Sequence, residues 1–384
     1  MKNIILINNL YKPFNRGGAE KIVEIIYREF KKQGHPVKII TTKPYGKKVP
    51  EQNKDIYYLN SFYYHLNKIP GPARLVWHIA DIFAFRKYRR IKKILAEEGG
   101  GLVITHNLKG IGFLTPGAIK KMKAEHFHVL HDIQLLHPGG LMMLNKEKII
   151  DSLPAYLYQK INAFLFRKVD KIISPSNWLL SLHLEKGFFK NSEKKVIFNP
   201  VTESFLNKDK KDPSPEKKKF TFLYVGQIEE HKGILLLIDA FKKFERQHSL
   251  QAELKIIGDG SAIKKAGRKA RGSNVVFTGK KDNKEIPKEM RKGDCLIIPS
   301  LCYENSPTVI YEAALAGVFI LASDHGGIPE AVSFFGGDMF RADDPENLAE
   351  KMHKIYKEAP QPAKGAGKKL KELTPSEYIK KMGV

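Results

Sequence analysis

Residues 295–312 read CLIIPSLCYENSPTVIYE, a short apolar run followed by a polar turn and then by the start of a helix. The apolar run that begins at Cys295 and ends at Pro299 has the length of a buried strand. Pro307 suits the first turn of a helix, because its missing N–H would have no partner there in any case. A strand, a loop and a helix in this order form half of a parallel β–α–β unit, so the stretch predicts an α/β fold.

The same alternation extends in both directions from this stretch. A helix is expected over 19–32, where Ile22, Ile26 and Phe30 recur on one face. Each half of the chain therefore predicts a doubly wound sheet of its own, with strands at 3–8, 37–42, 102–105, 127–130, 171–174 and 195–198 in the first half and at 220–225, 253–257, 274–278, 294–299 and 318–322 in the second.

A polar segment with two prolines, NKDKKDPSPEKKK at 207–219, separates the two halves and suits an exposed linker. The chain has 384 residues, more than the roughly 250–300 at which one hydrophobic core usually splits into domains. We therefore expect an N-terminal domain over 1–205, a linker over 206–219 and a C-terminal domain over 220–358.

The composition is that of a globular protein, with 42% apolar and 28% charged residues. A formal charge of +25 implies attraction to an anionic surface or ligand. Phosphorylated substrates and anionic lipid both remain open, as does a lysine-rich solvated surface with no specific partner. Nucleic acid is disfavoured, because no aromatic RNA-binding motif accompanies the charge. We expect no nucleic-acid partner.

No apolar stretch approaches the roughly eighteen residues that span a bilayer, and the run in the opening MKNIILINNL is too short for a signal-peptide core. We therefore expect a cytoplasmic protein. The segment 72–98 mixes Trp77, Ile79 and Phe85 with many arginines and lysines, and it reads as a basic amphipathic helix. Two interpretations remain open: a face that packs between domains, or peripheral binding to the anionic inner face of the plasma membrane.

Two acidic residues, Glu304 and Glu312, flank the expected start of a helix at Pro307 with seven residues between them. The backbone N–H groups of Thr308 and Val309 then lie at a helix N-terminus, where phosphate binds readily. Both carboxylates can accept hydrogen bonds from hydroxyl groups, as recognition of a sugar or a ribose requires. Ligands of parallel sheets bind beyond the carboxyl ends of the strands, so this loop predicts a ligand site.

Two glycine-containing loops also follow expected strands. Gly17 and Gly18 precede the helix over 19–32 and would let backbone N–H groups approach an anion closely. The loop VGQIEEHKG at 225–233 places Lys232 at the start of a helix, as a cation for phosphate. Neither loop is the G-x-G-x-x-G of dehydrogenases or the G-x-x-x-x-G-K-[ST] of P-loop NTPases, and both of these classes are disfavoured.

In this order the elements resemble glycosyltransferase family 4, whose members are retaining enzymes with the GT-B fold, two Rossmann-like doubly wound domains facing a cleft. The resemblance covers nearly the whole chain and rests on the Glu304–Glu312 spacing, the glycines at 17–18, the loop at 225–233, Gly258-Asp259-Gly260 and the glycine-rich turn at 326–330. It implies a hexosyltransferase that takes a sugar from a UDP- or GDP-linked donor and needs no further cofactor. The acceptor would be a glycan or a lipid-linked molecule in glycolipid, polysaccharide or other cell-surface glycan synthesis.

The resemblance also implies a role for each matching residue. Glu304 would contact the donor sugar, Glu312 the ribose, and Lys232 together with Gly18 the diphosphate. His131, in VLHD at 129–132, would face the donor sugar and complete a catalytic set with Glu304 and Lys232. The helix within 372–384 would pack back on the N-terminal domain.

Two donor-binding positions carry further expectations. The turn near Gly279 would meet the base of the nucleotide. Gln227 stands where the family usually has an arginine, so the charge of the diphosphate would depend more on Lys232. Because Lys232 stands where a divalent ion could otherwise neutralise phosphate, we expect no metal site. A nucleotide-sugar epimerase, hydrolase or phosphorylase on the same fold remains an alternative.

Overall fold

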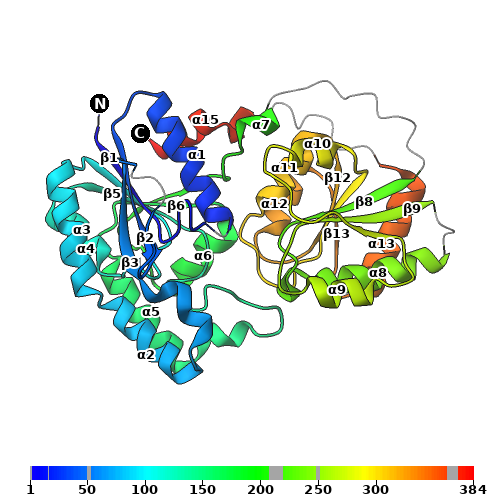
Figure 1. Ribbon diagram of the computed structural model, residues 1–384, viewed down its shortest axis with the longest axis horizontal. Helices are drawn as coiled ribbons and strands as arrows, with labels where there is room; N and C mark the ends of the chain where they lie inside the picture. Colours follow the sequence, from blue (N-terminus) through cyan, green and yellow to red (C-terminus); the bar gives the residue numbers. More distant parts are fainter. Residues whose placement is uncertain (1, 16, 50–52, 207–218, 248–250, 361–370) are drawn as a thin grey trace. The chain divides into compact units, whose positions relative to one another are not determined.

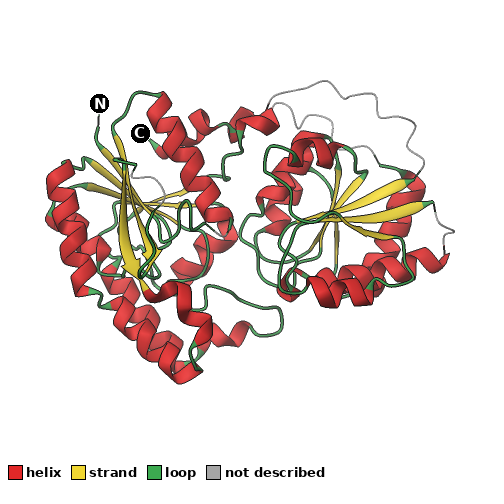
Figure 2. Cartoon of the chain, in the orientation of Figure 1, coloured by secondary structure: helices red, strands yellow, loops and turns green. Residues whose placement is uncertain are grey.

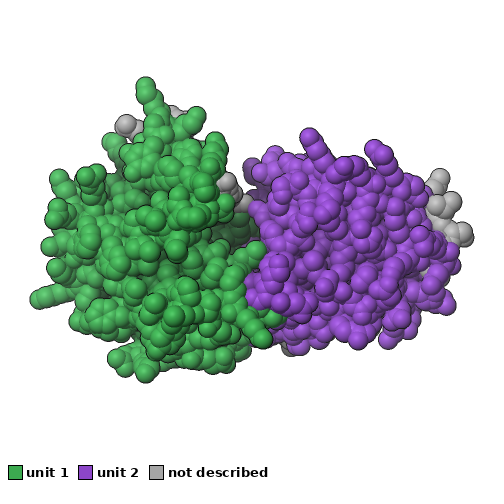
Figure 3. Space-filling view, turned by 90° about the horizontal axis from the view of Figure 1, so that it is seen from below, with its two compact units in different colours: residues 1–141, 147–200, 378–384 green, residues 142–146, 201–377 purple. Residues whose placement is uncertain are grey.

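The computed structural model describes residues 2–15, 17–49, 53–206, 219–247, 251–360 and 371–384, and the chain divides into two compact units (Figure 3). Unit 1 comprises 1–141, 147–200 and 378–384, and unit 2 comprises 142–146 and 201–377. Unit 2 thus begins at 201, a few residues before the expected domain boundary, and it also includes the segment 142–146. Residues 207–218 of the expected linker lie outside the described residues.

Unit 1 contains a seven-stranded parallel sheet in the order β3-β2-β1-β4-β5-β6-β7. Its strands are β1 (Ile4–Ile7), β2 (Val37–Pro44), β3 (Ile56–Ser61), β4 (Leu102–Thr105), β5 (Glu125–Val129), β6 (Lys171–Ser174) and β7 (Glu193–Val196). Its helices are α1 (Gly18–Lys32), α2 (Gly71–Ile82), α3 (Phe85–Glu98), α4 (Thr115–Lys121), α5 (Leu153–Leu165) and α6 (Asn177–Glu185), with 3₁₀ turns η1 (Phe62–Lys68) and η2 (Glu147–Asp151). Helices cover both faces of the sheet (Figures 1 and 2).

One face of this sheet is covered by α1 together with the C-terminal helix α15 (Pro375–Met382). Phe30 of α1 and Tyr378 and Ile379 of α15 are buried in the same core cluster as β1 and β4. Lys171 Nζ donates to the carbonyl of Met382 at 2.8 Å, so the end of the chain is also tied to β6. The C-terminal residues therefore complete the core of unit 1.

Two features of unit 1 differ from the sequence-based expectations. The edge strand β3 was not predicted, although its residues IYYLNS include three that favour strands. The expected helix over 72–98 is two helices, α2 and α3, with a break at Phe83 and Ala84. At this break Ala84 packs closely on Gly112, where a Cβ on the glycine would lie 2.7 Å from that of Ala84.

Unit 2 contains a six-stranded parallel sheet in the order β10-β9-β8-β11-β12-β13. Its strands are β8 (Phe220–Val225), β9 (Ala252–Ile257), β10 (Val275–Phe277), β11 (Cys295–Ile298), β12 (Phe319–Ser323) and β13 (Asp338–Phe340). Its helices are α7 (Glu203–Leu206), α8 (Ile234–Gln247), α9 (Ile263–Lys269), α10 (Ile286–Arg291), α11 (Thr308–Ala316), α12 (Ile328–Phe335) and α13 (Pro345–Glu358), with 3₁₀ turns η3 (Glu230–Lys232) and η4 (Lys371–Leu373). The prediction of two doubly wound α/β halves is confirmed.

None of the helices in the described part of the chain combines the length and the hydrophobicity that crossing a bilayer requires.

Gly233 lets the loop after β8 lie directly against the loop after β11. Its φ is +74°, and a Cβ at this position would lie 1.6 Å from the carbonyl oxygen of Pro299. Both the left-handed backbone and the close approach require glycine. This contact fixes the distance between two loops that carry predicted site residues.

We predict that Gly233→Ala lowers the free energy of unfolding by about 2–4 kcal/mol, because the new methyl group forces the two loops apart and the backbone is strained. Gly267→Ala is the matched control, since Gly267 lies inside α9 with open space around its Cα. This second change should be neutral or stabilise by up to about 1 kcal/mol. Urea denaturation of both variants checks the prediction, and equal effects would contradict it.

Unit 1 buries several histidines around β4 and β5. The side chain of Thr105 contacts His126 Nε2 and His128 Nδ1, both at 2.8 Å. Burial lowers the pKa of His126 to about 3 and that of His183 to about 4, so both side chains are neutral in the folded protein at pH 7. Because these folded-state pKa values lie below the unfolded value near 6.5, the unfolded state binds more protons in acid.

Unit 1 should therefore lose stability as the pH falls below about 6.5, at roughly 1.4 kcal/mol per pH unit for each such histidine. Asp81 and Asp132 act in the opposite direction below about pH 6, because burial raises the pKa of each to about 6. His126→Gln should reduce the difference in unfolding free energy between pH 7 and pH 5 by about 2 kcal/mol. His353→Gln, in α13 of unit 2, is the control. An unchanged pH dependence in His126→Gln would refute this account.

Candidate functional site

The strand order of unit 2 creates a point where two loops diverge. β8 and β11 are neighbours in the sheet, but the chain leaves β8 towards β9 and leaves β11 towards β12. In parallel sheets the crevice at such a point is where ligands bind. Lys232, at the end of η3, and Glu304, in the loop before α11, form an ion pair here. Lys232 therefore precedes α8 instead of opening it as expected, and Gly233 lies between them.

Glu304 is held in place from three directions. Its carboxylate is paired with Lys232 and also accepts a hydrogen bond from Ser300 Oγ at 3.0 Å. Its backbone carbonyl accepts from the N–H of Gly327 at 2.7 Å. Ser300 was not among the predicted site residues, although its position two residues after β11 could have indicated it. The glycine-rich turn at 326–330 thus supports the Glu304 loop.

The ion pair sets the charge of Lys232. Burial disfavours the ammonium form, but the negative charge of Glu304 outweighs this effect, and the pKa of Lys232 is raised. The two side chains keep 25% and 19% of their surface exposed, respectively, so a ligand can still reach them. Near neutral pH the site therefore presents one fixed cation and one carboxylate that can accept hydrogen bonds.

The N-terminus of α11 lies beside this pair in the chain. The helix begins at Thr308 with Pro307 as its N-cap, as the sequence predicted. Thr308 and Val309 are its first two residues, and backbone N–H groups in the first turn have no partner within a helix. Glu312, one turn further on, is 5% exposed. The arrangement suits an anion at the helix N-terminus.

The carboxyl ends of β8, β9 and β10 lie together, on the side of β8 away from β11. Gly226 follows β8 and donates its N–H to the carbonyl of Ile257 at 3.0 Å, and Gly258 donates to the carbonyl of Gly279 at 3.1 Å. The side chain of Gln227 is exposed, while its backbone carbonyl accepts from Tyr224 OH at 2.5 Å. Gly279 and Gln227 thus both lie at the carboxyl edge of the sheet.

In unit 1 the predicted residue His131 follows β5 and meets a second histidine that follows β4. His106 Nδ1 and His131 Nε2 are 2.8 Å apart, and the two rings stack with centroids separated by 5.1 Å. Burial lowers the pKa of His131 to about 4 and that of His106 well below its ordinary value. Both rings are therefore neutral near pH 7, and His131 suits an uncharged polar ligand better than an anion.

A carboxylate beside His131 was not predicted. Asp132 accepts from Asn107 Nδ2 at 3.1 Å and from the N–H of Gln134 at 2.7 Å. Burial raises the pKa of Asp132 to about 6, while the hydrogen bond from Gln134 and the nearby charge of Lys109 oppose this shift. Because Asn107 and Asp132 follow neighbouring strands, their positions were the signal that could have indicated this cluster.

The N-terminus of α1 holds an internal anion. The N–H of Gly17, the N-cap residue, donates to Glu20 Oε2 at 2.6 Å, and Glu20 itself is buried. Gly18 is the first helical residue, and the space beside its Cα is open. A phosphate at this helix N-terminus would have to approach the backbone of Gly18, because the N–H of Gly17 already donates to Glu20.

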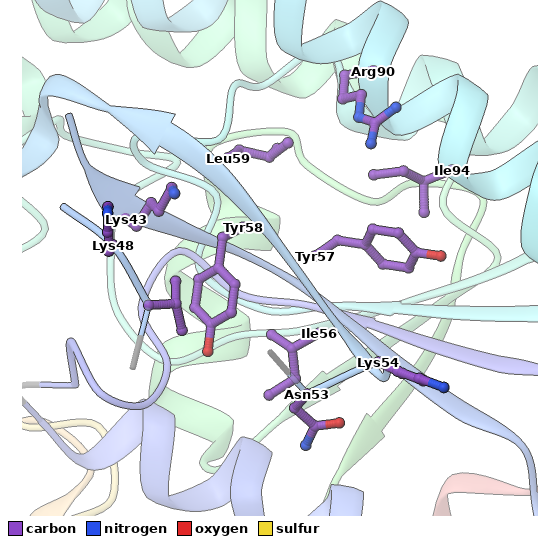
Figure 4. A pocket seen from close by; sticks show the side chains of 11 residues that line it. Lys43, Lys48, Asn53, Lys54, Ile56, Tyr57, Tyr58, Leu59, Arg90 and Ile94 are labelled. Carbon is purple, nitrogen blue, oxygen red and sulfur yellow. The ribbon is translucent and has the colours of Figure 1, made fainter. Parts of the chain in front are cut away.

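A pocket of about 610 Å³ lies at the edge of unit 1 formed by β3 (Figure 4). Its lining combines Tyr57 and Tyr58 of β3 with the basic side chains Lys43, Lys54 and Arg90. None of the predicted site residues lines it. The pocket is therefore distinct from the residues at the strand ends.

Two family models together match almost the whole chain. Glycosyltransferase Family 4 matches residues 16–205, and Glycosyl transferases group 1 matches residues 206–371. An uncharacterized 42.6 kDa protein in the cps region of Klebsiella pneumoniae is 29% identical over 338 residues, covering 85% of this chain and 87% of that protein. A lipopolysaccharide 1,2-N-acetylglucosaminetransferase of Salmonella typhimurium is 30% identical over 183 residues, covering 42% of this chain and 46% of that enzyme.

Solved structures share the fold. Anabaena HepE in complex with UDP superposes with a TM-score of 0.72 at 16% identity, covering 100% of this chain and 98% of that one. Sucrose-phosphate synthase from Thermosynechococcus elongatus superposes with a TM-score of 0.71 at 18% identity and the same coverage. With two parallel α/β units and both family matches in chain order, the protein belongs to the group 1 glycosyltransferases of family 4 and is a glycosyltransferase with the GT-B fold.

Proposed function

We propose that the protein is a retaining glycosyltransferase that takes a hexose from a UDP- or GDP-linked donor bound at α11 and transfers it to a hydroxyl group. The acceptor is a glycan or a lipid-linked molecule in cell-surface glycan synthesis. The observation that carries the proposal is the Lys232–Glu304 ion pair at the β8–β11 divergence, followed in the chain by the N-terminus of α11. A nucleotide diphosphate sugar needs this combination of a cation, free N–H groups and a carboxylate.

The ion pair and the donor would exchange partners. Without ligand, Lys232 and Glu304 neutralise each other, so neither partly buried charge is left uncompensated. When the donor binds, Lys232 turns to the diphosphate and Glu304 accepts hydrogen bonds from hydroxyl groups of the sugar. The phosphate also accepts hydrogen bonds from the backbone N–H groups of Thr308 and Val309. The charge that develops on the departing diphosphate is thereby stabilised in place.

Transfer with retention proceeds on one face of the sugar. The acceptor hydroxyl forms the new glycosidic bond from the side on which the bond to the diphosphate breaks, and its proton passes to the departing phosphate oxygen. His131 is neutral near pH 7, and it suits a hydrogen bond to a sugar hydroxyl in this step. The contribution of the protein is then orientation and electrostatic stabilisation.

The relatives support this assignment of substrates. HepE has been crystallised with UDP and with UDP-glucose, and Staphylococcus aureus TarM with UDP. The Salmonella relative transfers N-acetylglucosamine in lipopolysaccharide, and the Klebsiella relative comes from a cps region. These names favour a nucleotide-sugar donor and a surface glycan as the product.

A thermal-shift screen of UDP- and GDP-sugars tests donor binding, because a ligand that binds only the folded state raises its melting temperature. Product analysis with and without acceptor then separates transfer from the alternatives. Release of free sugar without an acceptor would indicate a hydrolase, sugar phosphate formed in the presence of phosphate would indicate a phosphorylase, and an isomeric nucleotide sugar would indicate an epimerase.

Transfer should not require a divalent metal ion, because Lys232 and the N-terminus of α11 supply the positive charge that the diphosphate needs. Activity measured after dialysis against EDTA is expected to remain within about twofold of the untreated rate. This margin is smaller than the decrease in rate that the loss of one hydrogen bond to a charged group would cause. Abolition of activity by EDTA, with recovery on adding magnesium or manganese, would overturn this expectation.

Glu304 and Glu312 should affect different kinetic constants. Glu304 contacts the sugar, whose charge changes in the transition state, so Glu304→Gln should mainly lower kcat. Glu312 holds a ribose that does not change, and Glu312→Gln should mainly raise the KM for the donor. Loss of one charge-assisted hydrogen bond corresponds to an effect of about 10-fold to 150-fold in either constant.

Glu350→Gln on the exposed side of α13 is the matched control and should leave both constants unchanged. All three amide variants should remain folded, because they create no cavity. Calorimetric titration with the free nucleotide gives an independent readout. Weaker nucleotide binding in Glu304→Gln, together with unchanged binding in Glu312→Gln, would show that the two roles are assigned the wrong way round.

A further inference from the structure

Helix α5 is oriented with polar side chains inward. Gln159 and Asn162 are 3% and 0% exposed, and both donate to backbone carbonyls beneath the helix. Gln159 Nε2 donates to Leu136 at 3.1 Å and to Ile150 at 2.7 Å, and Asn162 Nδ2 donates to Leu135 at 3.1 Å. These bonds fix the rotation of the helix about its axis.

The opposite face of α5 is apolar and exposed. Leu153, Leu157 and Phe164 keep 71%, 54% and 60% of their surface accessible, and Tyr156 keeps 50%. Tyr156 and Leu157 follow Leu153 by three and four residues, and Phe164 follows Leu157 by seven. All four side chains therefore lie on one stripe of the helix. A surface helix of a water-soluble domain has the reverse arrangement, with its apolar stripe facing the core. The inverted orientation therefore leaves the apolar stripe of α5 exposed to solvent.

Helix α2 shows the same property. Of its residues only Asp81 and Ile82 are buried, whereas Leu75, Val76 and Ile79 are 57%, 68% and 53% exposed. A helix of this length gains most of its stability in water from packing, and α2 packs little of its apolar surface within unit 1. The exposed fractions of its apolar side chains are similar to those of α5.

The two helices lie around the same loop of unit 1. Asp81 of α2 accepts from the N–H of Gly110 at 2.6 Å, and Phe113, three residues on, packs edge-to-face on Tyr158 of α5 with ring centroids 6.3 Å apart. Asp81 also influences the pKa of Tyr158 directly. The strand order places the β3–β4 connection, which contains α2, and the β5–β6 connection, which contains α5, on the face of the sheet opposite α1 (Figure 1). The exposed residues Leu75, Val76, Ile79, Leu153, Leu157 and Phe164 are called the α2–α5 face below.

Basic side chains lie on and beside this face, and Lys160 falls within the stripe between Leu157 and Phe164. Arg167 lies over the ring of Phe164 at 3.5 Å, and Lys160 lies over the ring of Tyr156 at 5.0 Å. The α5 sequence LPAYLYQKINAFL has no acidic residue, and the single acid of α2, Asp81, is buried. Apolar side chains that enter the acyl region, together with long basic side chains whose charged ends can reach the headgroups, complement an anionic bilayer. A second copy of the chain fits poorly, since a two-fold contact would bring the same cations together.

We propose that the α2–α5 face is a membrane-docking surface that inserts its apolar side chains into an anionic leaflet while Lys160, Arg167 and neighbouring cations contact the headgroups. The proposal extends the membrane expectation drawn from 72–98 to a second helix, and it does not depend on the identity of the donor. It predicts binding that requires both the apolar stripe of α5 and anionic lipid.

The test is co-sedimentation of the full chain with vesicles of phosphatidylcholine, with and without phosphatidylglycerol. The wild type should bind the anionic vesicles, and binding should fall as salt is added. Leu157→Gln combined with Phe164→Gln should weaken the partition coefficient at least about tenfold, because two apolar side chains no longer enter the bilayer. Lys160→Gln combined with Arg167→Gln should weaken it and reduce the dependence on salt.

Val276→Gln, an exposed apolar residue of β10 in unit 2, is the control for the apolar change, and Lys190→Gln is the control for the charge change. Thermal unfolding without vesicles should be the same for all variants, since the mutated side chains are exposed. Trp178→Phe leaves Trp77 of α2 as the remaining tryptophan, and its emission should shift to shorter wavelength with anionic vesicles.

Three outcomes would overturn the proposal. The first is failure of the wild type to bind anionic vesicles at low salt, and the second is unchanged binding by Leu157→Gln with Phe164→Gln. The third is a concentration-dependent dimer, seen by analytical ultracentrifugation, that disappears in this double variant. That result would assign the α2–α5 face to a second copy of the chain. Glycosyl transfer to a soluble acceptor is a separate readout, so failure of docking and failure of the proposed activity can be told apart.

Discussion

The divergence of two loops between β8 and β11 is the constraint on which the candidate site depends. Because each crossover connection of a parallel sheet has one hand, the strands on either side of this point send their loops in opposite directions. The side chains that project into the gap come from distant parts of the chain, and Lys232 and Glu304 are 72 positions apart. Gly233 and the turn at Gly327 then fix these loops at backbone distance. Sheet topology thus produces the charge arrangement of the site.

In each unit the predicted site residues follow the carboxyl ends of the strands of its own parallel sheet, but their electrostatic environments differ. In unit 2 the residues after the strands are a cation and a carboxylate that remain partly accessible. In unit 1 they are two stacked histidines whose burial keeps them neutral. A charged diphosphate fits the first environment, and uncharged hydroxyl groups fit the second.

Helix α5 shows how a local rule is overridden by its surroundings. Its sequence has an apolar stripe, and in isolation that stripe would be expected to face the core. Gln159 and Asn162 reverse the orientation, because the loop beneath the helix presents backbone carbonyls that need hydrogen-bond donors. The hydrogen-bonding requirement of a buried loop therefore determines which side of the helix meets the surroundings.

The sequence by itself determined the elements and the family. Apolar runs located nearly every strand, Pro307 marked the start of α11, and the spacing of Glu304, Glu312 and the glycine loops identified the group 1 glycosyltransferases, because these signals lie within short segments. The tertiary structure alone decided which segments meet. Strand order brings Lys232 to Glu304 and stacks His106 on His131. The close approach of Ala84 to Gly112 likewise joins distant segments. Local patterns report the period of a segment and its turn chemistry, but they carry no information on its neighbours in space.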